Sequence, residues 1–128
     1  MSPSIIEEFQ QRRETQNQTV LQYANQDIKR FFHLDHSVYR QNALPAKSKE
    51  MLGLVASLVL RCDDCISYHL QRCQAEDVTN EELIEVLSIG LVVGGSITIP
   101  HLRRALAFWQ ELNANAASTE SDSAQPVP

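Results

Sequence analysis

The residues of this sequence best suited to chemistry are a Cys-x-x-Cys pair, Cys62 and Cys65, and a histidine, His69. They stand at i, i+3 and i+7, so a helix would place all three on one face. The thiolate is the reactive form of cysteine, and a helix N-terminus or a nearby proton acceptor lowers a thiol pKa. Cys62 has the first advantage and Cys65 the second. The pattern predicts a redox-active dithiol in which one thiol attacks an oxidant and the other closes a disulfide.

Other uses of a Cys-x-x-Cys pair fit this sequence less well. A structural zinc site needs four converging ligands, whereas His69 and Cys73 continue along the same expected helix and would point along its length. Covalent haem attachment needs a histidine directly after the second cysteine, and Ile66 stands there. A thioredoxin-type site needs alternating strands and helices, and no useful strand-period segment occurs. We therefore expect neither a metal nor an organic cofactor.

Length, charge and cysteine usage restrict the class of protein. A chain of 128 residues, 43% of them hydrophobic and 21% charged, fits one folded domain. Its net charge is -5 and it has no long basic stripe, so nucleic acid is not an expected partner. No apolar run approaches the ~20 residues of a membrane span. The start lacks the basic and apolar regions of a secretion signal, and only three cysteines occur, so we expect a cytoplasmic location.

Apolar residues recur at helical spacing along most of the chain, which predicts an all-α fold. Over residues 5–34 we expect one long helix rather than two helices separated near residues 15–19. Pro45 suits a loop that leads into a helix beginning near Ala46. Residues 51–60 of that helix are apolar almost all round, which indicates burial in a core or a subunit interface. A further helix should open at the Cys-x-x-Cys pair.

The second half of the chain carries its own start and stop signals. Thr79 and Glu82 form the pattern of a capping box at a helix N-terminus, and Pro100 can begin a last helix. From Asn113 onward the composition is too polar and small to offset its ordering entropy. The expected organisation is an N-terminal helical extension over 1–43, a core over 44–112 and a disordered tail over 113–128.

A fourth residue, Glu50, is a candidate site residue only because of its spacing from the dithiol. The pattern is Glu50, eleven residues, then Cys62-x-x-Cys65-x-x-x-His69. It is preceded by Leu-Pro-Ala-Lys-Ser-Lys and followed by the capping-box helix and a Gly-Gly pair. This combination resembles the carboxymuconolactone decarboxylase family, and more closely its alkylhydroperoxidase D-like core, over about residues 44–109. From spacing alone, Glu50 would be part of a solvated helix start.

The resemblance implies an alkylhydroperoxidase D-like helical bundle that assembles into trimers or hexamers. It implies a peroxidase that reduces hydroperoxides and is recharged by a dithiol reductant, lipoyl-linked in the best-known members. Cys65 would be the attacking thiol, and Cys62 the resolving thiol that also meets the reductant. His69 and Glu50 would form the proton relay that deprotonates Cys65. The helix-dipole argument favours Cys62 as the nucleophile instead, so the order of attack stays open.

The sequence departs from the best-known peroxidases at Asp64, where they carry a second histidine. A carboxylate there removes a relay candidate and opposes a neighbouring thiolate. Two other functions stay open: a lyase of the γ-carboxymuconolactone decarboxylase type, and a non-catalytic redox sensor. Decarboxylation has no evident use for a dithiol. The remaining candidates are expected to be structural, with no recognisable partner for three histidines and a buried or interfacial role for the third cysteine: His33, His36, His101 and Cys73.

Overall fold

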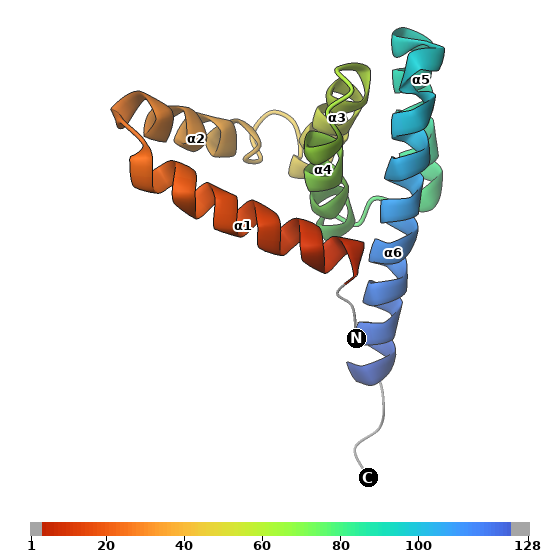
Figure 1. The fold of residues 1–128 in the computed structure, drawn as a ribbon. Helices are drawn as coiled ribbons and strands as arrows, with labels where there is room; N and C mark the ends of the chain where they lie inside the picture. The colour runs from red at the N-terminus through yellow and green to blue at the C-terminus, as the bar shows by residue number, and fades with distance from the viewer. Residues whose placement is uncertain (1–3, 124–128) are drawn as a thin grey trace. The chain divides into compact units, whose positions relative to one another are not determined.

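The computed structural model describes residues 4–123 and builds them from helices, with no strand in that range (Figure 1). The predicted all-α fold is confirmed. The helices are, in order, α1 (Ile5–Tyr23), α2 (Gln26–Val38), α3 (Ala46–Val59), α4 (Asp63–Ala75), α5 (Asn80–Gly94), the 3-10 turn η1 (Ser96–Thr98) and α6 (Ile99–Ser123).

The chain divides into two compact units, Met1–Lys49 and Glu50–Pro128. The division falls inside α3, and the expected extension over 1–43 and core over 44–112 stay predictions. All four residues of the predicted dithiol site therefore lie in the second unit.

The first unit contains two helices where one long helix was expected, so that prediction is wrong. The interruption lies at Asn25, not in the polar stretch 15–19. Asn25 caps α2 by accepting a hydrogen bond from the amide of Ile28 at 2.9 Å. Asparagine is among the preferred N-cap residues because its short side chain competes for backbone groups. The break between the two helices is therefore set by the Asn25 cap, while the weakly patterned stretch before it stays helical.

The second unit has a core to which α3, α4, α5 and α6 all contribute. Helix α4 packs against α6, and η1 packs against α5 and α6. The most deeply buried apolar side chains come from three of these helices: Leu54, Leu58, Ile66, Leu70, Leu83 and Leu87. The close approach of α3 and α5 depends on Gly90, where a Cβ would lie 2.7 Å from Leu58 Cδ2. This core fixes the rotation of α4 and so of the dithiol.

The helix starts around the core follow the sequence signals. Helix α3 begins at Ala46 and α4 at Asp63, both close to the predicted positions. At the start of α5, the Thr79 hydroxyl accepts from the Glu82 amide at 3.1 Å and the Glu82 carboxylate accepts from the Thr79 amide at 2.9 Å. The predicted capping box is therefore confirmed.

The last helix starts as predicted but ends later. Helix α6 begins at Ile99, beside Pro100, and continues to Ser123. The expectation of disorder is therefore wrong for residues 113–123, while residues 124–128 lie outside the described part of the chain. Three alanines, the strongest helix formers, extend the helix beyond the last core residue. They are Ala114, Ala116 and Ala117.

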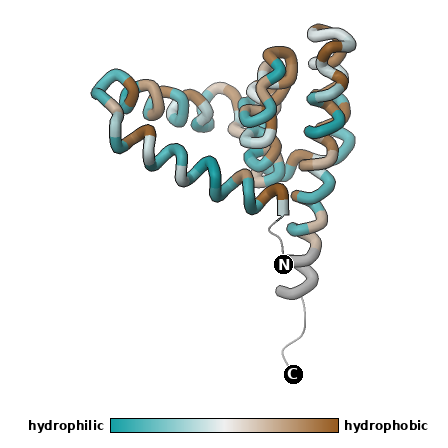
Figure 2. The backbone as a smooth tube through the Cα atoms, viewed as in Figure 1, coloured by the Kyte–Doolittle hydropathy of each residue, from teal (hydrophilic) through white to brown (hydrophobic). Residues whose placement is uncertain are grey.

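Hydrophobic residues lie along several helices (Figure 2). Some of their side chains are exposed. Helix α2 buries none of its side chains, although apolar and polar residues alternate along it. Leu52 on α3 is 57% exposed and Leu60, just after the helix ends, is 76% exposed, so burial is confirmed for one face of that helix only. Within residues 4–123, no helix combines the length and apolar character needed to cross a bilayer.

The capping box gives a test of the second unit's stability. Thr79→Ala removes the side-chain acceptor at the start of α5, and loss of an N-cap typically costs about 1 kcal/mol. We expect the free energy of unfolding to fall by that amount in urea denaturation followed by circular dichroism. Thr19→Ala is the matched control, because its hydroxyl bonds to the Thr15 carbonyl inside α1. Equal losses in the two variants would contradict the capping role.

Candidate functional site

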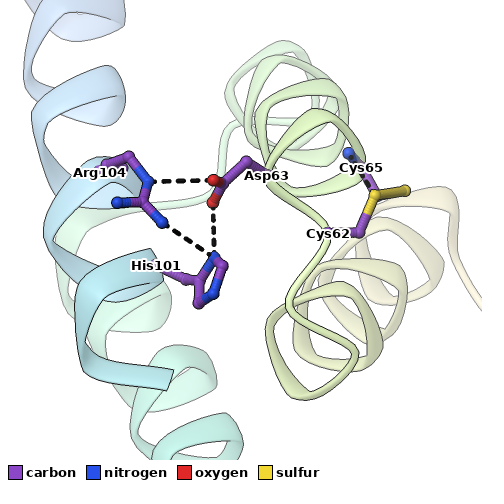
Figure 3. Close-up of polar contacts among 5 residues, drawn as sticks. All are labelled: Cys62, Asp63, Cys65, His101 and Arg104. Atoms are coloured by element: carbon purple, nitrogen blue, oxygen red, sulfur yellow. Dashed lines mark hydrogen bonds and ion pairs between the residues drawn. A yellow bond between two sulfur atoms is a disulfide. The ribbon is translucent and has the colours of Figure 1, made fainter. Parts of the chain in front are cut away.

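The dithiol lies at the N-terminus of α4. Cys62 and Cys65 form a disulfide with their Cα atoms 5.2 Å apart (Figure 3). Cys62 is the N-cap residue, and its sulfur accepts a hydrogen bond from the Cys65 amide at 3.2 Å. Cys65 is exposed and Cys62 half-buried. A helix N-terminus stabilises negative charge on a sulfur through its free amides and its dipole.

The turn before Cys62 is fixed by the end of α3. The amide of Cys62 donates to the carbonyl of Ser57 at 3.1 Å, and the amide of Arg61 donates to Leu58 at 3.0 Å. Arg61 has φ 59°, in the left-handed region that a helix C-terminus often uses. These features form a Schellman-type end in which arginine stands where glycine is commonest. The dithiol therefore follows α3 through a hydrogen-bonded turn.

Glu50 and His69, the two predicted relay residues, come together in the interior. Glu50 on α3 is 2% exposed and His69 on α4 is 7% exposed. The His69 Nδ1 atom lies 2.9 Å from Glu50 Oε2. When this nitrogen donates to the carboxylate, Nε2 becomes the ring atom that can take a proton. The helical spacing of four residues places His69 on the same face of α4 as Cys65.

Arg72 is a member of this cluster that the sequence analysis missed. Its Nε lies 3.6 Å from Glu50 Oε1, and its Nη2 lies 3.2 Å from Glu76 Oε1. A buried carboxylate is costly unless it is paired, and here each Glu50 oxygen faces a different partner. Its spacing could have predicted this. Arg72 follows His69 by three residues and precedes Glu76 by four, so a helix places the three side chains on one face.

The third cysteine, Cys73, is buried near this cluster, and we expect it to be unreactive. Cys73 is fully buried and is not in a disulfide. Burial raises the pKa of Cys73 from 9.0 to about 12, the negative charge of Glu50 adds to the rise, and Arg72 partly opposes it. The predicted buried location is confirmed. The thiol stays protonated and is not expected to compete with the dithiol.

A second polar cluster lies beside the dithiol, between α4 and α6. Asp63, the residue after Cys62, has Oδ1 at 2.8 Å from His101 Nδ1 and Oδ2 at 3.0 Å from Arg104 Nε. Figure 3 shows the carboxylate turned toward α6, with the sulfurs on the other side of the turn. The expectation that His101 has no partner is therefore wrong. The partner is 38 residues away in sequence, so local spacing could not reveal it.

The described residues do not gather metal ligands. Between residues 4 and 123, no group of three or more His, Cys, Asp or Glu side chains is placed to hold a metal ion. The arrangement instead offers a sulfur pair with one exposed cysteine, a buried carboxylate–imidazole pair and an ion-paired carboxylate next to Cys62. Such a set can exchange protons and electrons without a bound cofactor.

Comparison with known proteins agrees with this arrangement. The model of the carboxymuconolactone decarboxylase family matches residues 28–111. The chain belongs to the carboxymuconolactone decarboxylase family. The match includes both helices that carry the site, and it extends into the first unit.

Individual family members are similar in sequence and structure. A Thermotoga maritima protein of this family, with a suggested involvement in the antioxidative response, has a crystal structure that is 52% identical with a TM-score of 0.85. That match covers 88% of this chain and 96% of the other. A Legionella pneumophila family protein in its apo form shares the fold with a TM-score of 0.76 at 24% identity, covering 83% and 95% of the two chains.

A sequence relative from Cupriavidus necator is an uncharacterized protein. It is 33% identical over 75 residues, which is 59% of this chain. The match spans 66% of the relative's own length, just under two thirds. The name of this relative gives no activity, so the similarity indicates none for this chain.

The contrast among the three cysteines can be measured directly. In the reduced native protein at pH 8, we expect N-ethylmaleimide to label Cys62 and Cys65 rapidly and Cys73 at least about 100-fold more slowly, because the thiolate reacts and burial suppresses it at Cys73. Peptide mass spectrometry at timed quenches gives the three rates. In denaturant the three rates should become similar. Native labelling of Cys73 as fast as Cys65 would contradict the assignment.

Proposed function

We propose that this protein is a thiol-dependent peroxidase that reduces hydroperoxides and is recharged by a dithiol reductant. The observation that carries the proposal is the Cys62–Cys65 disulfide on a helix whose His69 pairs with the buried Glu50. Membership of the family and the suggested antioxidative role of the Thermotoga relative support it. A reducing compartment keeps dithiols available, so we also propose a cytoplasmic location.

The proposed reaction balances in two oxidative steps and one reductive step. The Cys65 thiolate attacks a hydroperoxide oxygen, so an S–O bond forms, the O–O bond breaks and the alcohol leaves after protonation. The Cys62 thiol then attacks the Cys65 sulfenic acid, closing the disulfide and releasing water. A dithiol reductant returns two electrons and two protons and becomes a disulfide itself.

His69 and Glu50 are proposed to manage the protons of these steps. The His69 ring would take the proton from Cys65, and the Glu50 carboxylate would hold the ring by its Nδ1 and stabilise the imidazolium that forms. Arg72 would keep the second carboxylate oxygen paired. The pair is buried and pre-positioned, which lowers the reorganisation needed when the proton moves.

The first thiol to react can be identified with single-cysteine variants. We expect Cys62→Ser, which keeps Cys65, to form a sulfenic acid with one equivalent of cumene hydroperoxide, because His69 still serves Cys65. Cys65→Ser should react much more slowly. Dimedone trapping and mass spectrometry measure the adduct, while stopped-flow oxidation with dithiothreitol measures turnover, which Cys65→Ser should lose.

Two further variants complete the test of the peroxidase. Cys73→Ser should turn over like the wild type, because that thiol is buried and protonated. His69→Gln should slow Cys65 oxidation by about 10²–10⁴-fold, the usual contribution of a general base. Wild-type turnover in Cys65→Ser would overturn the proposal. Reversible oxidation without turnover would indicate the redox sensor instead.

The lyase alternative receives less support from the structure. A cavity of about 360 Å³ opens beside the start of α5, away from the dithiol. Its lining side chains are apolar or carry amides, including Asn80, Leu83 and Trp109. They supply neither an acid–base pair nor a cation for a carboxylate substrate. Lactone decarboxylation that survives replacement of both dithiol cysteines would reverse this preference.

We also propose that the chain assembles into trimers or hexamers. The second half of α5 and the turn after it expose four large apolar side chains: Ile89 at 57%, Val92 at 84%, Val93 at 68% and Ile97 at 58%. The spacing of Ile89, Val92 and Val93 places them on one face of α5, and exposed apolar faces mark interfaces in soluble proteins. Covering it with further copies removes that surface from water.

Light scattering coupled to size exclusion tests the assembly. We expect a mass three or six times that of the chain. Val92→Asp should dissociate the assembly or weaken it strongly, because it would bury an unpaired charge. Gln10→Asp adds the same charge on an exposed polar position of α1 and should leave the mass unchanged. A monomeric wild type would contradict the proposal.

A further inference from the structure

The Asp63 cluster lies next to the dithiol, and the mechanism above gives it no role. Asp63 is the first residue of α4, directly after Cys62. Its side chain is 45% exposed, while His101 is 18% and Arg104 57% exposed. Two hydrogen bonds to α6 at 2.8 and 3.0 Å hold both carboxylate oxygens. The helix dipole alone would favour a carboxylate in the first turn of a helix, so it does not account for these two additional hydrogen bonds.

The charge of Asp63 affects the two oxidation states of the dithiol differently. The disulfide is neutral, whereas the reduced pair carries negative charge whenever a thiolate forms. A carboxylate one residue from Cys62 therefore opposes the reduced, ionised state. A cation beside the same sulfurs favours it. The Arg104 guanidinium is always charged and so offsets the carboxylate. The His101 Nδ1 atom lies 2.8 Å from the other oxygen and 3.3 Å from Arg104 Nη2.

We propose that Arg104 and His101 are positioning residues that set the redox potential of the Cys62–Cys65 couple, by offsetting the Asp63 charge and holding its carboxylate on the α6 side of the turn. Figure 3 shows this arrangement, with Asp63 between the two α6 side chains and the sulfurs. The proposal rests on the redox-active dithiol of the proposed function but not on peroxide turnover, so the two can fail separately.

The measurement is the equilibrium of the whole protein with dithiothreitol at pH 8. Each reduced dithiothreitol gives two electrons and two hydrogens to the disulfide, forming two cysteine thiols and cyclic oxidised dithiothreitol. Acid quenching and mass spectrometry give the reduced fraction and hence the equilibrium constant. No hydroperoxide is present, so a protein without peroxidase activity still gives a potential.

The variants are chosen so that two explanations predict different shifts of the equilibrium constant for reduction. An effect of charge shifts it in opposite directions in the two single variants, whereas a loss of contacts between α4 and α6 shifts it in the same direction. Arg104→Gln leaves Asp63 without its cation and should lower the equilibrium constant for reduction about fivefold, which is about 20 mV for a two-electron couple. Asp63→Asn leaves the cation without its carboxylate and should raise the constant by a similar factor. The double variant should return close to the wild type. If the cluster only braced the helix, both single variants would shift the constant in the same direction.

Two controls keep the result interpretable. Arg104→Lys retains the charge and should stay within about twofold of the wild type, which also covers the case in which Arg104→Gln folds poorly. Arg103→Gln removes an equal charge from the adjacent position of α6, outside the cluster, and should change the constant little. Same-sign shifts in Arg104→Gln and Asp63→Asn, or no shift in either, would overturn the proposal. A dithiol that dithiothreitol cannot reduce would overturn the redox function as well.

Discussion

The burial of one carboxylate, that of Glu50, constrains the structure around the dithiol. An ionised side chain that is 2% exposed costs several kcal/mol unless its oxygens are paired. Glu50 lies on α3 and both of its partners, His69 and Arg72, lie on α4. The pairing therefore fixes how α4 is rotated against α3. The hydrogen-bonded turn that ends α3 then delivers Cys62 to the N-cap position of that rotated helix.

The same carboxylate separates the roles of the cysteines. Its hydrogen bond orients His69, which serves the face of α4 that carries Cys65. Its negative charge also adds to the burial that raises the pKa of Cys73 to about 12. In the proposed mechanism, one buried charge thus supports proton removal at an exposed thiol, while it disfavours proton loss at the buried Cys73. We expect selectivity among the three thiols to follow from their exposure and their electrostatic surroundings, since their intrinsic chemistry is the same.

Sequence reasoning succeeded where the signal was local. Pro45, the Thr79 capping box and Pro100 each predicted a helix start within a residue or two, because caps and prolines act on adjacent backbone groups. It failed where one residue decided between continuing and ending a helix, as at Asn25 and beyond Leu112. In the site, the resemblance supplied Glu50, which spacing alone had assigned to a solvated helix start. The ion pair of Asp63 with Arg104 spans 41 residues, and only the packing of α4 on α6 creates it.

The environments of the two redox sulfurs bear on which one a reductant attacks. Exposure favours attack at Cys65, whereas the family resemblance assigns that contact to Cys62. Attack at one sulfur requires the other to leave, and a leaving thiolate is helped by a nearby acid. If Cys62 is attacked, Cys65 leaves, and in the proposed mechanism His69, which would take the Cys65 proton during oxidation, can return it. Attack at Cys65 would expel Cys62, whose stabilisation comes from the Cys65 amide and the helix dipole rather than from a proton donor. The buried pair therefore favours the assignment that the resemblance implies, because one histidine then serves Cys65 in both directions of the cycle.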